Sequence, residues 1–428
     1  MKDNNCDSGG ILMKLSRFNI EHPVSDGLIL YNTLSSGILL LEKEDIKDYF
    51  NIKNECCLSN EKLKNELCKG RMLIDKEFDE IEFIKFTNTA SRFSGRGLGL
   101  TIAPTLYCNF ACPYCFEKGV KFDQMSDEVI LSLVSFIKNY IGGKEPLSIT
   151  WYGGEPLLAI DIIERITKLV FDDSEYENMN YSSDIITNGY LLTRNVAKKL
   201  KNLGITNAQI TLDGPPRIHD SRRKLMSGGK TFDRILKNIK ETCDLIDITI
   251  RVNLDRTNQD DVKELIDIIK FEGLYDKVFI YVAKVDDFFN DSNPSLLTSV
   301  EFSEKYNDFL TNNKNYIQIA EFNPNVCGAV NINSFVIDPS GNMYKCWDEI
   351  GRDEGVVGNV SSGIDYNKTF FNYINNDPLS SEKCLDCKIL PLCMGGCPFQ
   401  KKISGDSVCR SKKYSIESEL ENIYMNTI

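Results

Sequence analysis

The chain has 428 residues, 42% of them hydrophobic, and its 62 acidic residues outnumber its 50 basic ones for a formal net charge of -12. This length allows a large core and favours two or three domains. The acidic balance disfavours binding to a nucleic-acid backbone, and neither a bilayer-spanning apolar run nor a cleavable leader is evident, so we expect a cytoplasmic protein that binds neither nucleic acid nor membrane.

The sequence contains 15 cysteines but only two histidines, His22 and His219. Without a secretion signal, so many cysteines argue for bound metal rather than for disulfides. The shortage of histidine counts against His-based nucleophilic catalysis and against His-rich zinc sites. We therefore expect the chemistry of this protein to depend on sulfur.

Residues 1–95 are predicted to form a small N-terminal α+β module. Its expected strands and helices, in chain order, are residues 18–21, 27–31, 36–42, 43–50 and 60–67. The four cysteines in or beside it are interpreted as incidental thiols, because the adjacent pair would be awkward as ligands of one metal: Cys6, Cys56, Cys57 and Cys68.

From residue 97 onward, strand and helix patterns alternate. Strands are predicted at residues 100–106, 147–152, 183–187, 208–212, 246–253 and 277–282. Amphipathic helices are predicted at residues 127–140, 157–171, 194–203, 232–242 and 260–271. Six β/α repeats imply a parallel sheet with right-handed crossovers, which could be open or closed.

Three cysteines follow the first of these strands with the spacing C-x3-C-x2-C: Cys108, Cys112 and Cys115. Such a set can direct three thiolates at one 4Fe–4S cluster and leave its fourth iron without a protein ligand. A structural zinc site normally has four protein ligands, so three cysteines suit zinc poorly. The spacing therefore favours an iron–sulfur cluster with an open iron.

With Tyr114 before the last cysteine, this motif resembles the signature of radical S-adenosylmethionine (SAM) enzymes, in particular their peptide-maturase branch. The resemblance implies a partial (β/α)6 TIM-like barrel, here residues 96–315, with its sites at the C-terminal ends of the strands. It also implies that SAM binds at the open iron and is cleaved reductively to a 5'-deoxyadenosyl radical. Cys108, Cys112 and Cys115 would then be catalytic as well as metal-binding.

Several residues after the strands match segments that contact SAM in this family. Gly153 and Gly154 form a turn in which the backbone could pass close to a ligand, and the resemblance assigns Glu155 to the methionyl amine. The remaining candidates are Tyr114, Asn188 and Thr211 for polar contacts and Arg223 for the SAM carboxylate. The alternative for the Asn188 and Thr211 segments is an ordinary turn, and His219 is interpreted as a structural hydrogen-bonding residue.

Seven further cysteines lie in the last third of the chain: Cys327, Cys346, Cys384, Cys387, Cys393, Cys397 and Cys409. Two CxxC-like pairs alone would be typical of a zinc ribbon. Behind the barrel motif, these spacings instead resemble the SPASM extension, here residues 316–428, which holds two auxiliary 4Fe–4S clusters. The chain would then carry three clusters in total.

The resemblance assigns Cys384, Cys387, Cys393 and Cys409 to one auxiliary cluster, and the remaining three cysteines, Cys327, Cys346 and Cys397, to the other. Some relatives supply a further cysteine at the position of Asn333. Because this chain has no cysteine there, the cluster of Cys327, Cys346 and Cys397 is predicted to have an open iron that could bind a substrate thiolate.

Sulfatase-maturating relatives carry an aspartate directly after the cysteine that corresponds to Cys346. Here Trp347 takes that place and Asp348 follows. In an extended segment Asp348 would point elsewhere, which disfavours formylglycine formation.

We therefore predict a radical SAM/SPASM enzyme that installs a thioether cross-link in a ribosomally made, cysteine-containing precursor peptide. A flavodoxin- or ferredoxin-like protein would donate the electron. The N-terminal module resembles winged-helix domains that hold the leader of a precursor, although it could equally be an elaboration that covers the barrel. Alternatives are formylglycine formation, carbon–carbon cross-linking, epimerisation and, in another class, a non-catalytic zinc-binding interaction module.

Overall fold

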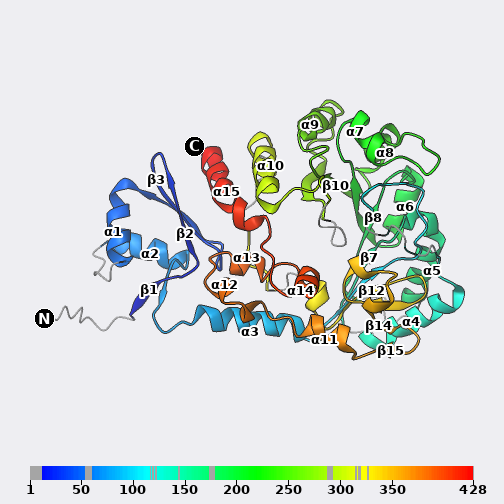
Figure 1. The fold of residues 1–428 in the computed structure, drawn as a ribbon, viewed down its shortest axis with the longest axis horizontal. Helices are drawn as coiled ribbons and strands as arrows, with labels where there is room; N and C mark the ends of the chain where they lie inside the picture. Colours follow the sequence, from blue (N-terminus) through cyan, green and yellow to red (C-terminus); the bar gives the residue numbers. More distant parts are fainter. Residues whose placement is uncertain are drawn as a thin grey trace, which may run out of the picture.

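A computed structural model describes residues 12–53, 60–115, 117, 120, 123–142, 145–172, 179–286, 293–313, 316, 320–324 and 327–427. Its largest element is a ten-stranded sheet with the order β11-β10-β9-β8-β7-β6-β12-β13-β14-β15. Figure 1 shows this sheet and its helices at one end of an elongated molecule and the N-terminal strands at the other. Cys6, Cys56 and Cys57 lie outside the described residues.

Six neighbouring strands of this sheet are parallel. They are β6 (Leu98–Ile102), β7 (Leu147–Trp151), β8 (Tyr181–Thr187), β9 (Ile205–Thr211), β10 (Asp247–Leu254) and β11 (Val278–Lys284). Each overlaps a predicted strand. The sheet is open, with β11 and β15 as its edges. The predicted fold class, a partial TIM-like barrel, is confirmed.

The helices between and after these strands include all five predicted ones and two that the sequence had not indicated, at residues 216–222 and 299–312. They are α4 (Asp127–Ile141), α5 (Ile160–Phe171), α6 (Arg194–Asn202), α7 (Pro216–Arg222), α8 (Phe232–Thr242), α9 (Val262–Phe271) and α10 (Ser299–Asn312), with the 3-10 turn η1 (Pro156–Ala159) before α5. α4 illustrates their local signals. Ser126 caps its N-terminus by accepting from the Val129 N–H, and Gly142 ends it with a φ of 53°.

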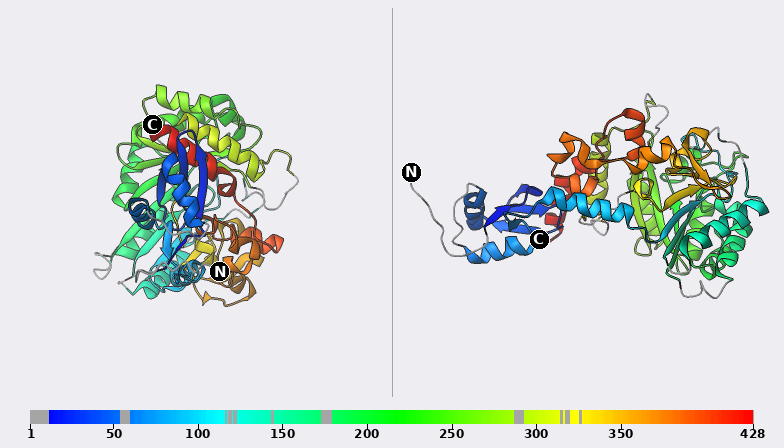
Figure 2. Two further views of the ribbon diagram at one scale, coloured as in Figure 1. Left: turned by 90° about the vertical axis from the view of Figure 1, so that its left-hand side faces the viewer. Right: turned by 90° about the horizontal axis from the view of Figure 1, so that it is seen from below.

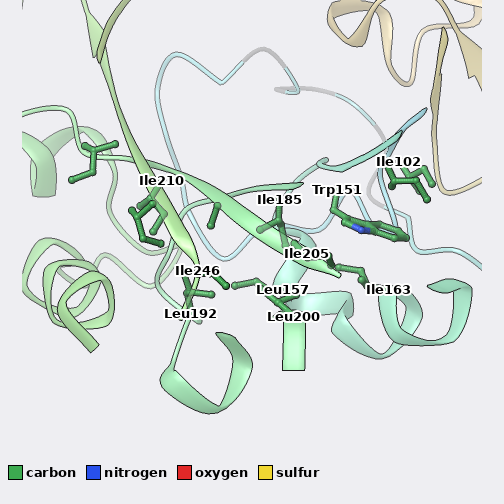
Figure 3. Close-up of a cluster of buried hydrophobic side chains, with 14 of the residues drawn as sticks. Ile102, Trp151, Leu157, Ile163, Ile185, Leu192, Leu200, Ile205, Ile210 and Ile246 are labelled. Carbon is green, nitrogen blue, oxygen red and sulfur yellow. The ribbon is translucent and has the colours of Figure 1, made fainter. Parts of the chain in front are cut away.

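The main core lies between the parallel strands and these helices (Figure 3). Strand side chains alternate between this core and the opposite face of the sheet, as the burial of every second residue in β10 shows. The labelled side chains of Figure 3 are Ile102, Trp151, Leu157, Ile163, Ile185, Leu192, Leu200, Ile205, Ile210 and Ile246. This rigid layer fixes the positions of the loops that follow the strands.

The N-terminal residues form a smaller three-stranded antiparallel sheet and a separate two-stranded pair. The sheet contains β2 (Asn19–Val24), β3 (Gly27–Asn32) and β4 (Ile38–Glu42), the pair contains β1 (Met13–Leu15) and β5 (Leu73–Asp75), and the helices are α1 (Lys43–Lys53), α2 (Glu61–Lys69) and α3 (Glu80–Phe93). The sequence had not indicated α3, although Asp79 caps it by accepting from the Ile81 and Glu82 N–H groups.

The C-terminal third continues the barrel sheet. β12 (Ser334–Ile337) pairs in parallel with β6, and β13 (Asn342–Tyr344), β14 (Val356–Asn359) and β15 (Gly363–Ile364) follow antiparallel. The helices are α11 (Lys368–Ile374), α12 (Glu382–Leu385), α13 (Leu390–Cys393), α14 (Pro398–Ser404) and α15 (Lys412–Thr427). Short 3-10 turns are η4 (Gly328–Val330), η5 (Trp347–Glu349), η6 (Asp353–Gly355) and η7 (Pro378–Ser380). In the described part of the chain, no helix has the length and apolar character needed to cross a membrane.

The N-terminal sheet packs against the cysteine-rich C-terminal segment. Ile20 and Tyr31 share a buried cluster with Ile416 and Leu420 of α15. The Thr33 hydroxyl donates to the Lys388 carbonyl at 2.5 Å. The Arg17 guanidinium donates to the Leu385 carbonyl at 2.8 Å. The first strands of the chain therefore rest on the loop that carries Cys384, Cys387 and Cys393.

Helix α3 connects the N-terminal elements to the barrel, as the right-hand view of Figure 2 shows. At its start, Glu80 accepts from the Ser16 hydroxyl and the Arg17 N–H. At its end, the buried Arg92 donates to the carbonyls of Val330 and Ile374. Arg92 thus holds α3 against the segment that follows Cys327.

We expect Arg92→Met to destabilise the protein by about 2–4 kcal/mol, because it leaves buried carbonyl groups without a charged donor. The free energy of unfolding would be measured by urea titration followed by intrinsic fluorescence. Arg96→Met, at an exposed position just past the same helix, is the matched control and should change stability by less than about 0.5 kcal/mol. Equal effects of the two substitutions would contradict the anchoring role of Arg92.

Candidate functional site

The three motif cysteines lie together in the loop after β6. Cys108 and Cys112 are partly buried against the main core, whereas Cys115 is exposed. The Phe110 N–H donates to the Cys108 sulfur at 3.4 Å. Burial, with smaller contributions that include the two neighbouring thiols, raises the pKa of Cys108 to about 12. A thiol with such a high pKa ionises readily only beside a cation. An iron site would supply that cation, since iron binds the thiolate form of cysteine.

Gly153 and Gly154 bring the turn after β7 into direct contact with the cysteine loop. A Cβ atom on Gly153 would lie 2.5 Å from the Thr105 carbonyl oxygen, and one on Gly154 would lie 2.4 Å from that of Tyr107. Gly153 also has a φ of 106°. These glycines therefore make room for the backbone of the cysteine loop. Their predicted contact with SAM stays a prediction.

Glu155 ties this turn to the end of β8. Its fully buried carboxylate accepts from the Thr187 hydroxyl at 2.6 Å and from the Asn188 N–H at 2.8 Å. Burial raises the pKa of this carboxyl. The Asn188 side chain donates in turn to the Asn109 side chain in the cysteine loop at 2.7 Å. The predicted contacts of Glu155 and Asn188 with SAM stay predictions.

Tyr114 lies at the centre of a polar network next to the cysteine loop. Its hydroxyl hydrogen-bonds to Asp213 and accepts from the Arg223 guanidinium at 2.8 Å. The Arg223 Nε is buried and has no partner among the residues that the structure describes. A buried guanidinium with a spare donor fits an anionic ligand, as the predicted role toward a carboxylate requires. Thr211 is buried at the end of the neighbouring strand β9.

Sequence reasoning missed Arg222, the residue beside Arg223. Arg222 is 8% exposed and pairs with Asp213 at 3.1 Å and with Asp255 at 2.8 Å. Its guanidinium also lies 4.9 Å from the centre of the Tyr114 ring. Two adjacent arginines cannot be assigned to a structural and a ligand-facing role from sequence, because the distinction depends on which acids face them.

The interpretation of His219 as structural is confirmed. Its fully buried ring accepts from the Asp213 N–H at 3.3 Å and hydrogen-bonds to the Thr231 hydroxyl at 3.1 Å. Burial, reinforced by the charge of Arg223, lowers its pKa to about 3. His219 is therefore neutral and supports the turn that carries Asp213.

The structure brings together the set of three C-terminal cysteines assigned to one cluster. Cys327, Cys346 and Cys397 pack around Ala329, Tyr373 and Phe399. Within the described ranges, no three His, Cys, Asp or Glu side chains are close enough to share a single metal ion. A four-iron cluster needs wider spacing, because its irons and sulfides lie between the thiolates.

The set of four assigned to the other cluster lines one pocket. Cys384, Cys387, Cys393 and Cys409 face it together, and the rest of the lining is mostly apolar, including Ile389, Leu390 and Val408. Four cysteines around an apolar pocket are the kind of donor set that an iron–sulfur cluster requires. The seven cysteines are thus grouped in space as three and four. Their assignment to two clusters stays a prediction.

The expected direction of Asp348 is wrong. Residues 347–349 form the 3-10 turn η5 rather than an extended segment, and the Glu349 N–H donates to the Cys346 carbonyl at 3.2 Å. Because the chain turns, the Asp348 carboxylate lies 3.6 Å from the Cys346 sulfur. Burial raises the pKa of Asp348 to about 6.

Tyr152 and Glu117, which sequence reasoning did not single out, connect the two cysteine regions. The Tyr152 ring lies 5.9 Å from that of Trp347. Burial raises the pKa of Tyr152 well above its usual value, and nearby charges on Glu117, Cys115 and Asp348 act in the same direction. Glu117 has a buried carboxylate oxygen with no partner in the described part of the chain. The sequence signal that could have identified Glu117 was its position two residues after Cys115.

Residues 102–269 match the family model of the Radical SAM superfamily. The chain contains a radical SAM domain. It is therefore an enzyme of a group whose members use SAM and a 4Fe–4S cluster. The cysteine loop, the glycine turn and the Tyr114 network all lie within the matched residues.

Two curated relatives match different lengths of this radical SAM enzyme. The cysteine-type anaerobic sulfatase-maturating enzyme of Clostridium perfringens (strain 13 / Type A) is 27% identical over 341 residues, or 70% of this chain and 88% of the relative. A GTP 3',8-cyclase of Campylobacter jejuni subsp. doylei is 35% identical over 182 residues. That match covers 40% of this chain and 52% of the cyclase, so the chain spans about half of that relative.

Solved structures show the same fold over more of the radical SAM chain. Native anSMEcpe with bound AdoMet and Cp18Cys peptide matches with a TM-score of 0.61 and 22% identity, over 77% of this chain and 98% of that one. Streptococcus suis SuiB bound to its precursor peptide SuiA matches with a TM-score of 0.53 and 15% identity, over 92% of this chain and 97% of that one.

The low pKa of His219 makes the radical SAM domain sensitive to acid. Unfolding releases a histidine with an ordinary pKa of 6.5, whereas the folded value is about 3. Between pH 6.5 and about 3 the unfolded state therefore binds more protons than the folded state. The contribution of His219 to stability is complete above pH 6.5. It falls by about 1.4 kcal/mol per pH unit as the pH drops toward the pKa of the folded state. We expect His219→Gln to remove this component, measured as the pH dependence of the difference in unfolding free energy. A constant difference across that range would contradict the prediction.

Proposed function

We propose that this radical SAM enzyme modifies a cysteine-containing peptide and joins the cysteine sulfur to a peptide carbon in a thioether bond. The observation that carries the proposal is the position of Tyr152. Its ring lies 5.9 Å from that of Trp347, the residue after Cys346, and the charges of Cys115, Glu117 and Asp348 act on its hydroxyl. A substrate held there would contact the SAM-binding loop on one side and the C-terminal cysteines on the other. The SuiB structure, which was solved with a precursor peptide, shares the fold over nearly the whole chain.

The donor sets suit three 4Fe–4S clusters. Cys108, Cys112 and Cys115 would hold the cluster that binds SAM, and the C-terminal groups of three and four cysteines would hold two auxiliary ones. When bound, SAM and its cluster supply a radical that abstracts hydrogen. The spare donor of Arg223 would orient the SAM carboxylate, and Glu155, with Asn188 and Thr211 nearby, would face the amine and ribose.

Thioether formation requires the peptide to give up a hydrogen atom, a proton and an electron. One C–H bond and one S–H bond break, and one C–S bond forms. The hydrogen atom goes to the deoxyadenosyl group and the electron leaves toward the C-terminal cysteine region. Asp348 would accept the thiol proton; the support for this role is its carboxylate beside Cys346 and its influence on Tyr152.

Asn333 supports an open position at the group of three cysteines. Its side chain accepts from the Tyr140 hydroxyl at 2.6 Å, and its carbonyl accepts from the Gly99 N–H at 3.0 Å. These contacts commit Asn333 to the helix and strand of the barrel. A substrate thiolate could then complete the donor set of Cys327, Cys346 and Cys397.

Formylglycine formation is the second candidate, and the position of Asp348 favours it. The same loss of a hydrogen atom, a proton and an electron from one cysteine gives a thioaldehyde, which water converts to an aldehyde with release of sulfide. The product masses distinguish the candidates, because a thioether keeps the sulfur. A carbon–carbon cross-link would also keep it, but would leave the thiol free to react with iodoacetamide.

The proposed function also requires partners for the precursor leader and for electron supply. We infer that the N-terminal sheet binds the leader of the precursor and that a flavodoxin- or ferredoxin-like protein supplies electrons. Chemistry of this kind needs a reducing, oxygen-poor compartment, so we place the enzyme in the cytoplasm. The chain's formal net charge of -12 matches a basic peptide better than an acidic one.

Replacing Asp348 tests its role as a base. We expect Asp348→Asn to reduce product formation by about 100-fold or more while SAM cleavage to 5'-deoxyadenosine continues. Liquid chromatography with mass spectrometry would quantify both products from one incubation with a cysteine-containing peptide. Asp353→Asn, at an exposed position in the nearby turn η6, is the control and should leave both unchanged. Wild-type product yield from Asp348→Asn would remove the proposed base.

Cysteine substitutions separate the cluster roles. Cys108→Ala should abolish SAM cleavage, because the SAM-binding cluster loses a ligand, whereas Cys327→Ala should keep uncoupled cleavage and lose product. Cys68→Ala, outside all three groups, is the control. The anaerobically reconstituted wild type should contain about 12 irons per chain with matching sulfide. Tightly bound zinc without sulfide, or full product from Cys327→Ala, would contradict the proposal.

A further inference from the structure

Arg251 stands out among the charged residues of the parallel sheet. The six parallel strands contain only four such residues: Asp184, Asp247, Arg251 and Lys284. Lys284 pairs with Asp286. Arg251 has no carboxylate partner among the described residues, and its one hydrogen bond there runs from Nε to the Asn253 side-chain oxygen at 2.7 Å. Within this part of the chain, its terminal nitrogens Nη1 and Nη2 therefore have donors to spare.

The side chain of Arg251 lies on the polar face of the sheet, opposite the main core. The residues on either side of it in β10 are buried in that core, and the side chains of a strand alternate between its two faces. In register with Arg251, Thr211 lies on β9 and Tyr281 lies on β11. The guanidinium is 6.0 Å from the centre of the Tyr281 ring. The contacts with Tyr281 and Asn253 thus hold the guanidinium on this face.

This face of β10 leads to the Tyr114 network. The Asn253 side chain, two residues further along the strand, donates to the Tyr114 hydroxyl at 3.5 Å. Successive residues on one face of a strand are about 7 Å apart, so Arg251 lies one such step from the network. Burial raises the pKa of Tyr152, and the charge of Arg251 acts in the opposite direction, so these two groups are within electrostatic range of each other. Arg251 therefore supplies positive charge beside the space that the proposed function gives to the substrate.

We propose that Arg251 binds a carboxylate of the substrate peptide and thereby selects peptides that carry an acidic group near the reacting cysteine. This inference rests on the proposed function, which places a peptide beside Tyr152. A planar guanidinium with both terminal nitrogens available binds a carboxylate through two parallel hydrogen bonds. An aspartate or glutamate side chain and a free C-terminus offer the same chemistry, and the experiment distinguishes them. SAM carries a carboxylate too, which the proposed function assigns to Arg223.

The test measures peptide binding rather than turnover. Short synthetic peptides with one central cysteine in an alanine and lysine background would carry a single aspartate, placed in turn at each flanking position. Each would be compared with its asparagine counterpart, and each as the free acid and as the C-terminal amide. Fluorescence anisotropy of an N-terminal dye would report binding to the anaerobically reconstituted full chain in the presence of SAM.

The variants are Arg251→Met, which removes the charge, and Arg251→Lys, which keeps the charge but not the planar fork. The matched control is Arg234→Met. Arg234 is an exposed arginine on α8 whose guanidinium likewise lies near a tyrosine, 5.2 Å from the centre of the Tyr190 ring. Isothermal titration calorimetry would measure the affinity of each protein for SAM, which also shows that the variant is folded.

We expect the wild type to bind at least one aspartate peptide about tenfold more tightly than its asparagine counterpart, or the free acids about tenfold more tightly than the amides. Arg251→Met should abolish this preference, Arg251→Lys should keep part of it, and Arg234→Met should match the wild type.

A wild type that does not distinguish acid from amide at any position would overturn the carboxylate site, whether or not the variants fold. A preference that survives in Arg251→Met would overturn it too, and a simultaneous loss of SAM affinity would assign Arg251 to the SAM carboxylate instead. These outcomes leave the proposed function standing. A wild type that binds SAM but none of the peptides would overturn the proposed function as well.

Discussion

The contact between the turn after β7 and the loop after β6 constrains everything else in the site. Two parallel strands deliver these segments to the same edge of the sheet, and only glycine at residues 153 and 154 lets their backbones touch. Hydrogen bonds from the Gly154 and Glu155 N–H groups to Thr105 and Tyr107 then fix the cysteine loop in place. Any larger residue would displace the cysteines relative to the strand ends.

The second organising feature is the continuation of the barrel sheet through β12. Because β12 pairs with β6, the segment between Cys327 and Cys346 is placed by the same strand that leads to Cys108. Two regions that lie far apart in sequence therefore share one rigid frame. The polar residues between them, Tyr152 and Asp348, owe their proximity to this pairing rather than to local sequence.

The sequence predicted those parts of the protein that depend on short-range patterns. The alternation of strand and helix patterns and the spacing of the cysteines are local signals, and the structure follows them. Asp348 was misjudged because its direction depends on one 3-10 turn. Arg222, Tyr152 and Glu117 were missed because their roles depend on which distant side chains face them. Helix α3 was missed although Asp79 is a regular N-cap, since three of its four buried residues, Glu80, Asn88 and Arg92, are polar and give no apolar periodicity.

The packing of β2 and β3 on α15 has a consequence for synthesis. Ile20, Ile29 and Tyr31 bury their side chains against Ile416, Leu420 and Tyr424, so the first strands to leave the ribosome wait for the last helix before this face is covered. Contacts of such long sequence separation form slowly, and an uncovered apolar sheet face is prone to aggregation. The nascent N-terminal sheet is therefore the part of this chain with the greatest need of a chaperone.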